Sequence, residues 1–273
     1  MIASDRPSLA FERPLPIPSS GVQGVDDYIR DGFERVPGMS STFSAAIVAG
    51  LLQIQSENGQ HGHVIEIGVF EGRFLLAMAR ALAADEIAIG IDTFDWPDQA
   101  VLQRFRDHCA RQGLEERVVA FKSSSAGLGD GEVRALLGGH PCRLIHVDGD
   151  HSPASASGDL GLCDRCLDAQ GLIVVDDVLH PNYPRLTLAL FEFLDQRPGW
   201  RVLCAIDRTS LVGAAKYVLC RTPYFAIYDG ALRTRFRRHV WPVDADMGHY
   251  RSMILSCDQS YLPSMMQYGV RRR

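Results

Sequence analysis

The stretch VIEIGVFEGRF, residues 64–74, decides the fold, because it joins an apolar strand to a helix through a turn that carries two glycines. Glu66 lies near the strand end, Gly68 follows in the turn, and Gly72 precedes the helix. Glycine is needed where the backbone turns sharply and a ligand must touch it without a Cβ in the way. The stretch departs from the dinucleotide fingerprint G-x-G-x-x-G at Phe70, so a ligand without a pyrophosphate fits this turn better.

Around this turn the chain alternates short apolar strands with helical segments, which indicates a mostly parallel α/β sheet with helices on both faces. The expected strands are 64–67, 87–91, 118–122, 144–147, 172–175, 201–205 and 216–220. The expected helices between them are 73–84, 98–112, 131–137 and 156–169. The last two strands are too close together for a crossover helix. They are therefore expected to form a hairpin and to end the sheet with an antiparallel strand.

The composition is that of an ordinary globular protein and excludes several classes. The chain has 273 residues, 46% hydrophobic and 22% charged, which fits one large domain with extensions. A formal charge of −5 gives no field to attract nucleic acid, and no apolar run reaches the length of a membrane span. The amino-terminal residues lack the features of a signal peptide, and the seven cysteines are scattered. We therefore expect a cytoplasmic protein with reduced thiols, in which Cys163 and Cys166 are structural.

The chain divides into three parts in this interpretation. Residues 1–60 form an arm and helices that serve as a lid or a dimer contact, and residues 61–221 form the core. Residues 222–273 form a basic extension without clear periodicity, expected to be a solvated face and a frayed tail, or a basic rim for an anionic substrate or a partner subunit. Its clustered arginines are Arg233, Arg235, Arg237 and Arg238, and the chain ends in Arg271, Arg272 and Arg273. A homodimer or a higher homo-oligomer is expected.

The second expected strand ends in GIDTF and places Asp92 about twenty residues beyond the glycine turn, where an acid can bind both hydroxyls of a ribose. A glycine turn and a ribose acid together indicate an adenosine-type ligand. These residues resemble the first two motifs of class I S-adenosylmethionine-dependent methyltransferases. The resemblance implies a Rossmann-like, seven-stranded sheet, with Glu66, Gly68 and Gly72 around the methionine part of the cofactor and Asp92 at its ribose.

The third expected strand ends in FKSSSAG, where many members of that family have an acid near the adenine. Here Ser123 and Ser124 would have to contact the adenine instead.

Acidic side chains follow the fourth and fifth expected strands, in IHVDGDHS (145–152) and GLIVVDDVLH (171–180). Open α/β sheets bind ligands at these strand ends, and converging carboxylates need a shared cation or protons. Mg²⁺ suits oxygen ligands best, with Mn²⁺ also possible. A single acid at such a place can also be a helix cap or a solvated turn residue. The expected metal ligands are Asp148, Asp176 and Asp177, with Asp150 as an alternative to Asp148, which is also an expected cofactor contact.

Two histidines accompany these acids. His151 lies three residues beyond Asp148 and is the expected proton acceptor, because its ordinary pKa is roughly 6.5. It would deprotonate an acceptor hydroxyl on the metal, and the oxygen would then attack the sulfonium methyl in line. His180 is a second acid-base group, a substrate contact or a simple turn residue.

The acidic cluster is similar to that of the metal-dependent O-methyltransferases, which include catechol and caffeoyl-CoA O-methyltransferases. There a lysine three residues beyond the first acid is the base; His151 stands at that place. The DGDHS and DD motifs resemble more closely the macrocin and mycinamicin sugar O-methyltransferases and the cephalosporin-hydroxylase-like branch. The resemblance covers roughly residues 60–221. It implies a metal-assisted O-methyltransferase acting on a hydroxyl of a small-molecule natural product or saccharide.

Two alternatives remain open from the sequence. One is a metal-independent methyltransferase with His151 or His180 as base, and the other is a non-catalytic binding module on the same fold. Acceptor choice depends on residues 1–60 and 221–273, outside the core. Aromatic side chains that could line an acceptor pocket or simply pack are Phe11, Tyr28, Phe43, Trp96, Tyr183 and Trp241.

Overall fold

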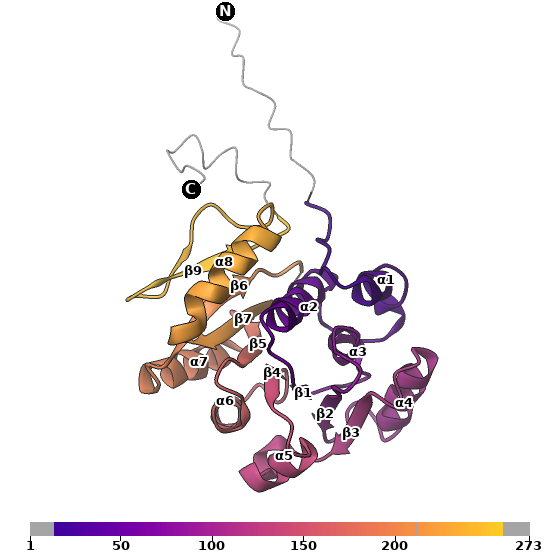
Figure 1. The fold of residues 1–273 in the computed structure, drawn as a ribbon. Coiled ribbons are helices and arrows are strands. Elements are labelled where there is room, and N and C mark those ends of the chain that lie inside the picture. Colours follow the sequence, from indigo (N-terminus) through magenta and orange to yellow (C-terminus); the bar gives the residue numbers. More distant parts are fainter. Residues whose placement is uncertain (1–13, 211, 259–273) are drawn as a thin grey trace, which may run out of the picture.

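A computed structural model describes residues 14–210 and 212–258 of the chain. Within them, nine strands form one sheet in the order β3-β2-β1-β4-β5-β7-β6-β9-β8 (Figure 1). The strands are β1 (His63–Ile67), β2 (Ala88–Asp92), β3 (Val118–Lys122), β4 (Cys142–Val147), β5 (Leu172–Val178), β6 (Trp200–Ile206), β7 (Ala215–Arg221), β8 (Ala245–Asp246) and β9 (Arg251–Leu255). Strands β1 to β5 pair in parallel, and β7 lies antiparallel between β5 and β6. The predicted fold class and hairpin are confirmed.

The sheet is two strands wider than the seven that we expected, because the segment after Arg221 is ordered. Strand β9 pairs in parallel with β6, and β8 adds a short antiparallel edge. In β9 the side chains of Ser252, Met253 and Leu255 are buried, although Arg251 beside them is exposed. Such a short run, flanked by polar residues, gives no clear strand periodicity in the sequence.

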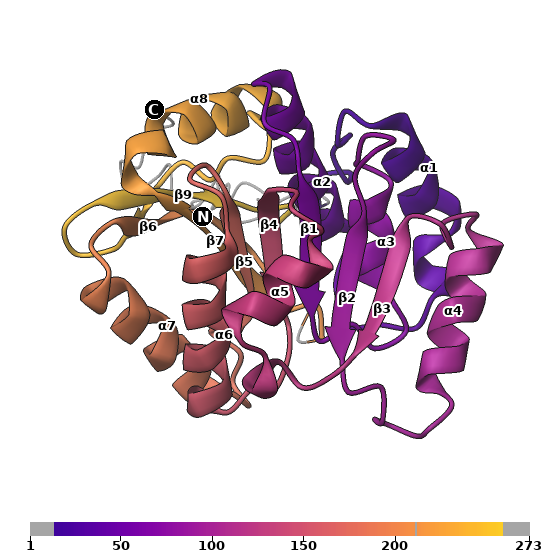
Figure 2. The same cartoon turned by 60° about the horizontal axis from the view of Figure 1, so that its bottom comes forward.

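Helices cover both faces of the sheet, as Figure 2 shows. One hydrophobic cluster joins the sheet to α1 (Gln23–Asp31), α2 (Thr42–Glu57), α3 (Arg73–Ala79), α4 (Val101–Arg111) and α8 (Phe225–Arg235). A second cluster joins it to α5 (Asp130–Leu136), α6 (Pro153–Cys166) and α7 (Pro184–Gln196). Successive residues of a strand point to opposite faces, so Leu144 belongs to the first cluster and Ile145 to the second. The central strands β1, β4 and β5 are buried on both sides, so their sequences show no regular alternation of apolar and polar residues.

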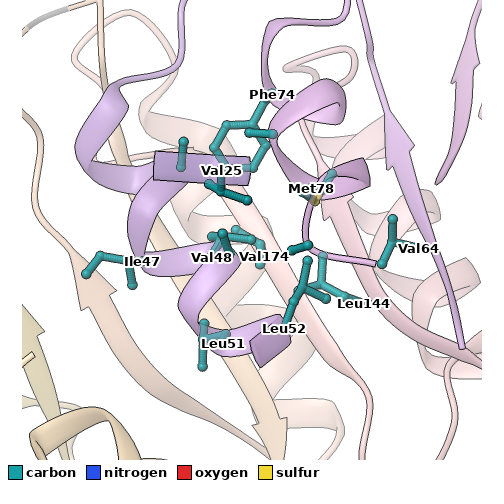
Figure 3. Close-up of a cluster of buried hydrophobic side chains, with 14 of the residues drawn as sticks. Val25, Ile47, Val48, Leu51, Leu52, Val64, Phe74, Met78, Leu144 and Val174 are labelled. Carbon is teal, nitrogen blue, oxygen red and sulfur yellow. The ribbon is translucent and has the colours of Figure 1, made fainter. Parts of the chain in front are cut away.

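Helix α2 is the centre of the first cluster. Ser41 caps its start by accepting a hydrogen bond from the backbone of Ser44. Its apolar side chains are buried almost all round, because α1, α3, α8 and the sheet surround it. Figure 3 shows side chains of α2 meeting Val64, Leu144 and Val174 of the sheet and Phe74 of α3. The amino-terminal helices are therefore part of the core.

Among the clustered arginines beyond β7, Arg237 and Arg238 are exposed, and two others make internal contacts. Arg233 is paired with Asp229 and Asp244, and Arg235 binds Glu57 of α2. These contacts fasten α8 to its neighbours, as expected of structural rather than ligand-binding arginines. Residues 1–13 and 259–273, with Phe11 and the three terminal arginines, lie outside the described residues. In the part that the structure describes, no helix has the length and apolar character needed to cross a membrane.

Candidate active site

A cavity of about 730 Å³ opens at the carboxyl ends of β1, β2, β4 and β5. Its walls include every predicted site residue except Gly72: Glu66, Gly68, Asp92, Ser123, Ser124, Asp148, His151, Asp176, Asp177 and His180. The parallel topology explains this convergence, since neighbouring parallel strands end at the same edge. Of the aromatic side chains named from the sequence, Trp96 and Tyr183 line the cavity, whereas Tyr28 and Phe43 are buried in the core.

The glycine turn passes directly against the loop after β4. Gly68 has a φ of 82°, and a Cβ at this position would lie 2.0 Å from the backbone oxygen of Asp148. Only glycine allows this approach. Gly72 has a φ of 91° and caps the start of α3, where a Cβ would meet the ring of Phe105 at 2.7 Å. Gly72 therefore serves helix packing, whereas Gly68 shapes the cavity.

Asp92 holds the glycine turn as well as lining the cavity. Its Oδ2 accepts hydrogen bonds from the backbone of Val69 (2.7 Å) and Phe70 (2.9 Å), and its Oδ1 accepts one from Phe94 (2.7 Å). A carboxylate has about four acceptor positions, so capacity for a ribose hydroxyl remains. Ser123 and Ser124 line the same end of the cavity, and the backbone N–H of Ser123 donates to the carbonyl of Asp92.

Glu66 lies buried beneath the turn and shares a hydrogen bond of 2.7 Å with Nδ1 of His146 on β4. Burial raises the pKa of Glu66 well above its ordinary range. Burial, together with the nearby Lys216 charge, holds the pKa of His146 well below its ordinary value. Oε2 of Glu66 has no hydrogen-bond partner among the described residues, and Glu66 lines the cavity. An orphaned buried acceptor at this place fits the charged methionine end of the expected cofactor.

The predicted acid trio divides into two groups. One oxygen of Asp176 is bound by Nζ of Lys216, a buried lysine on β7, and the other accepts the backbone N–H of Asp177 at 2.8 Å. Asp148, His151 and Asp177 instead bring their ligand atoms within 4.8 Å of one another. Asp150 is exposed and accepts a hydrogen bond of 2.7 Å from Ser155 at the start of α6. The geometry thus favours Asp148 over Asp150, and His151 over Asp176, as a neighbour of a metal ion.

The acids and His151 influence one another's ionisation. Burial, and then the carboxylate of Asp176, raise the pKa of Asp148 well above its ordinary range. Nε2 of His151 lies 2.6 Å from Oδ2 of Asp177, and this hydrogen bond raises the pKa of His151. A divalent cation would relieve the repulsion among the acids, so the residues present fit such an ion.

Three stacked rings form the wall next to this cluster. Tyr183 stacks on His151 at 3.9 Å between ring centroids and on His180 at 4.9 Å. Nδ1 of His180 accepts the backbone N–H of Asn182. His180 therefore lines the cavity beside the acid cluster, with Tyr183 between the two histidines.

Four residues of the site were not found from the sequence: Ser40, Arg73, His146 and Lys216. His146 and Lys216 do leave a signal, because a charged or polar residue inside an apolar strand (LIHV, AAKYVLC) is unusual and is explained only by a buried partner. Ser40 and Arg73 leave none, since they belong to a loop and a helix start of ordinary composition.

The fold is that of the class I methyltransferases, with the cavity at the carboxyl ends of β1, β2, β4 and β5. Residues 65–178 match a family model described as a methyltransferase domain. The chain therefore contains a segment, less than half of its length, that is similar to methyltransferase domains. No curated protein matches the sequence.

Solved structures share the fold at low sequence identity. A putative O-methyltransferase from Klebsiella pneumoniae is 20% identical with a TM-score of 0.52, over 74% of this chain and 90% of that one. An O-methyltransferase from Bacillus cereus in complex with SAH is 15% identical with a TM-score of 0.52, over 73% and 90%. The SAH-bound methyltransferase PaMTH1 from Podospora anserina is 16% identical with a TM-score of 0.52, over 77% and 90%.

Proposed function

We propose that the protein transfers the methyl group of S-adenosylmethionine to a hydroxyl of a small-molecule natural product or saccharide, assisted by a divalent cation. The convergence of Asp148, His151 and Asp177 in the cavity, directly beside the glycine turn, carries the proposal. Neighbours in fold that are described as O-methyltransferases support oxygen as the acceptor atom.

In this proposal the cofactor spans the cavity from β1 to β3. Glu66 and Gly68 hold its methionine end, Asp92 binds its ribose, and Ser123 with Ser124 borders its adenine. The protein's main contribution to rate is orientation, because the sulfonium carries its own leaving group.

Asp148 and Asp177 would supply oxygen ligands to Mg²⁺ or Mn²⁺, with His151 beside them. When bound, such an ion lowers the pKa of a hydroxyl that it coordinates. With its Nε2–H donated to Asp177, the neutral His151 ring has Nδ1 left to accept the hydroxyl proton. Tyr183 stacks on this ring and holds its plane.

The charge of the cavity supports an uncharged acceptor such as a sugar. Among its described lining residues, Arg73 is the only arginine or lysine, against several carboxylates. The guanidinium of Arg73 donates to the backbone oxygens of Val36 (2.6 Å) and Ser40 (3.5 Å), so it is engaged in holding residues 36–40 against the site. An acceptor carrying a phosphate or carboxylate would meet no available arginine or lysine among these lining residues. The lining by Gly38, Met39 and Ser40 also supports a lid role for this segment.

A metal-independent methyltransferase is the second candidate, and the direct hydrogen bond between His151 and Asp177 favours it. An acid that orients a histidine forms a base without help from a metal. Chelators would then leave the rate of methyl transfer unchanged.

The proposal is tested by calorimetric titration of S-adenosylhomocysteine into chelator-treated protein, and of Mg²⁺ into a separate sample. Binding of the nucleoside and a distinct Mg²⁺ isotherm are expected. Methyl transfer from labelled S-adenosylmethionine to a panel of neutral sugars and polyols should then stop on chelation. If S-adenosylhomocysteine binds neither to the chelator-treated protein nor to protein supplied with Mg²⁺, the methyltransferase proposal is wrong. If methyl transfer continues after chelation, the metal-independent candidate is correct.

A further inference from the structure

Lys216 is a buried cation that belongs to the site but not to its cavity wall. It projects from β7 and is 1% exposed, with Nζ 4.8 Å from the centre of the Phe74 ring. Nζ binds Oδ2 of Asp176 and donates to Oγ of Ser40 at 3.0 Å. A lysine is almost never fully buried unless it is paired, so the ion pair accounts for its place in the strand.

The contacts of Asp176 occupy three of its about four acceptor positions, and one of the three is made to a cation. Oδ2 carries the lysine and lies 3.5 Å from the Ser40 hydroxyl, while Oδ1 accepts the N–H of Asp177. Ligand atoms converge in two groups among the described residues, Glu66–His146–Asp148 and Asp148–His151–Asp177, and Asp176 belongs to neither, although it directly precedes Asp177. The positive charge of Lys216 also repels any cation near this carboxylate.

We propose that Lys216 is a positioning residue that withholds Asp176 from the metal, and thereby limits both the affinity for the ion and the number of protein ligands around it. The inference rests on the proposed metal site. An additional carboxylate would occupy a coordination position that an acceptor hydroxyl needs, since divalent ions in this class of site must keep positions open for substrate.

Substitution Lys216→Met tests the inference because it should raise the affinity for Mn²⁺, whereas damage to the fold would lower it. Removal of the lysine frees Asp176 and removes a repelling charge, so Mn²⁺ should bind at least tenfold more tightly, measured by electron paramagnetic resonance on cofactor-free protein. Lys216→Arg keeps the charge and should keep the wild-type affinity. Arg143→Met, at the buried ion pair with Glu86, is the matched control for losing a buried cation elsewhere and should also keep it. Equal or weaker Mn²⁺ binding by Lys216→Met with an intact circular dichroism spectrum would overturn the inference.

A second pair of variants decides the matter if Lys216→Met does not fold. Asp176→Asn should change the Mn²⁺ affinity less than fivefold, whereas Asp177→Asn should lower it at least a hundredfold. Equal losses in the two variants would overturn the inference, because Asp176 would then be a ligand.

The wild-type titration separates failure of this inference from failure of the metal proposal. If wild-type protein binds no Mn²⁺ but Lys216→Met does, the lysine blocks the site and metal assistance in the wild type is wrong. If neither binds Mn²⁺ at millimolar concentration, both are wrong.

Discussion

Two buried ion pairs lie at opposite ends of the central strands and differ in whether they lie beside the cavity. At the amino end, Arg143 of β4 binds Glu86 at 2.7 Å, and its other nitrogens donate to Gly62 and Leu52 among others. At the carboxyl end, Lys216 binds Asp176, while Glu66 Oε2 and His146 Nε2 keep no hydrogen-bond partner among the described residues. The amino-end pair does not line the cavity, whereas Asp176 and Glu66 at the carboxyl end do.

The largest effect is expected at the amino-end pair. Arg143→Met leaves Glu86 buried without its partner and should lower the free energy of unfolding by about 3–5 kcal/mol, measured with urea. The double variant with Glu86→Leu should recover most of the loss. Affinity of the folded protein for S-adenosylhomocysteine should not change; a tenfold loss would remove the distinction between the two ends.

Asp159 on α6 extends the comparison to a buried acid that has no cationic partner among the described residues. Burial raises its pKa to about 6, and a hydrogen bond with Ser125 only partly opposes this. Because the folded state binds the proton more tightly than an unfolded chain, whose aspartate has a pKa near 3.8, stability is lost as pH rises from about 4 to 6. Asp159→Asn should therefore stabilise the protein at pH 7.5 by on the order of 2 kcal/mol and have no such benefit at pH 4. A pH-independent difference in urea unfolding would contradict this.

Glu66→Gln tests whether the buried carboxyl at the carboxyl ends of the strands contributes to cofactor binding. Because burial already raises the pKa of Glu66, its neutral form is favoured in the empty protein and the amide should cost little stability. Affinity for S-adenosylhomocysteine should fall about tenfold, by calorimetry, since Glu66 lines the cavity and its Oε2 has no hydrogen-bond partner among the described residues.

Glu71→Gln is the matched control in the same turn. Its carboxylate binds Arg104 (2.6 Å) and His108 (3.1 Å) instead of facing the cavity, so stability should fall and affinity should be kept. Equal affinity losses in the two variants would show that Glu66 acts only through the fold.

The smallest expected effect is a difference in titration midpoint between His151 and His146. In metal-free protein, histidine ring signals in nuclear magnetic resonance should place the midpoint of His151 above about 6.5, because Asp177 stabilises its charged form. Protonated His151 therefore stabilises the fold at low pH, and this contribution is lost as pH rises through its raised pKa. Burial and the nearby Lys216 charge lower the pKa of His146, so its midpoint should lie below that of an ordinary histidine. The variants His151→Gln and His146→Gln assign the two signals. A higher midpoint for His146 than for His151 would contradict the His151–Asp177 contact and the burial of His146.

The positions of the acids could be predicted because they depend on topology alone. Apolar runs locate the strands, and parallel strands bring residues that follow them, such as Asp92, Asp148 and Asp177, to one edge. The direction of a side chain within a loop was not predictable, so Asp148 and Asp150 could not be separated. Neither was the partner of Asp176, since Lys216 lies 40 positions away on a strand antiparallel to its own.

Gly68 in the glycine turn packs directly against the backbone of Asp148 in the loop after β4, so these two segments are expected to move together. A shift of the glycine turn is expected to displace the loop after β4, because no side chain lies between the two backbones at Gly68. Nucleoside and metal are therefore expected to be linked thermodynamically, each changing the affinity of the other by the same factor. Order of addition would then matter for the rate of assembly but not for the final occupancy.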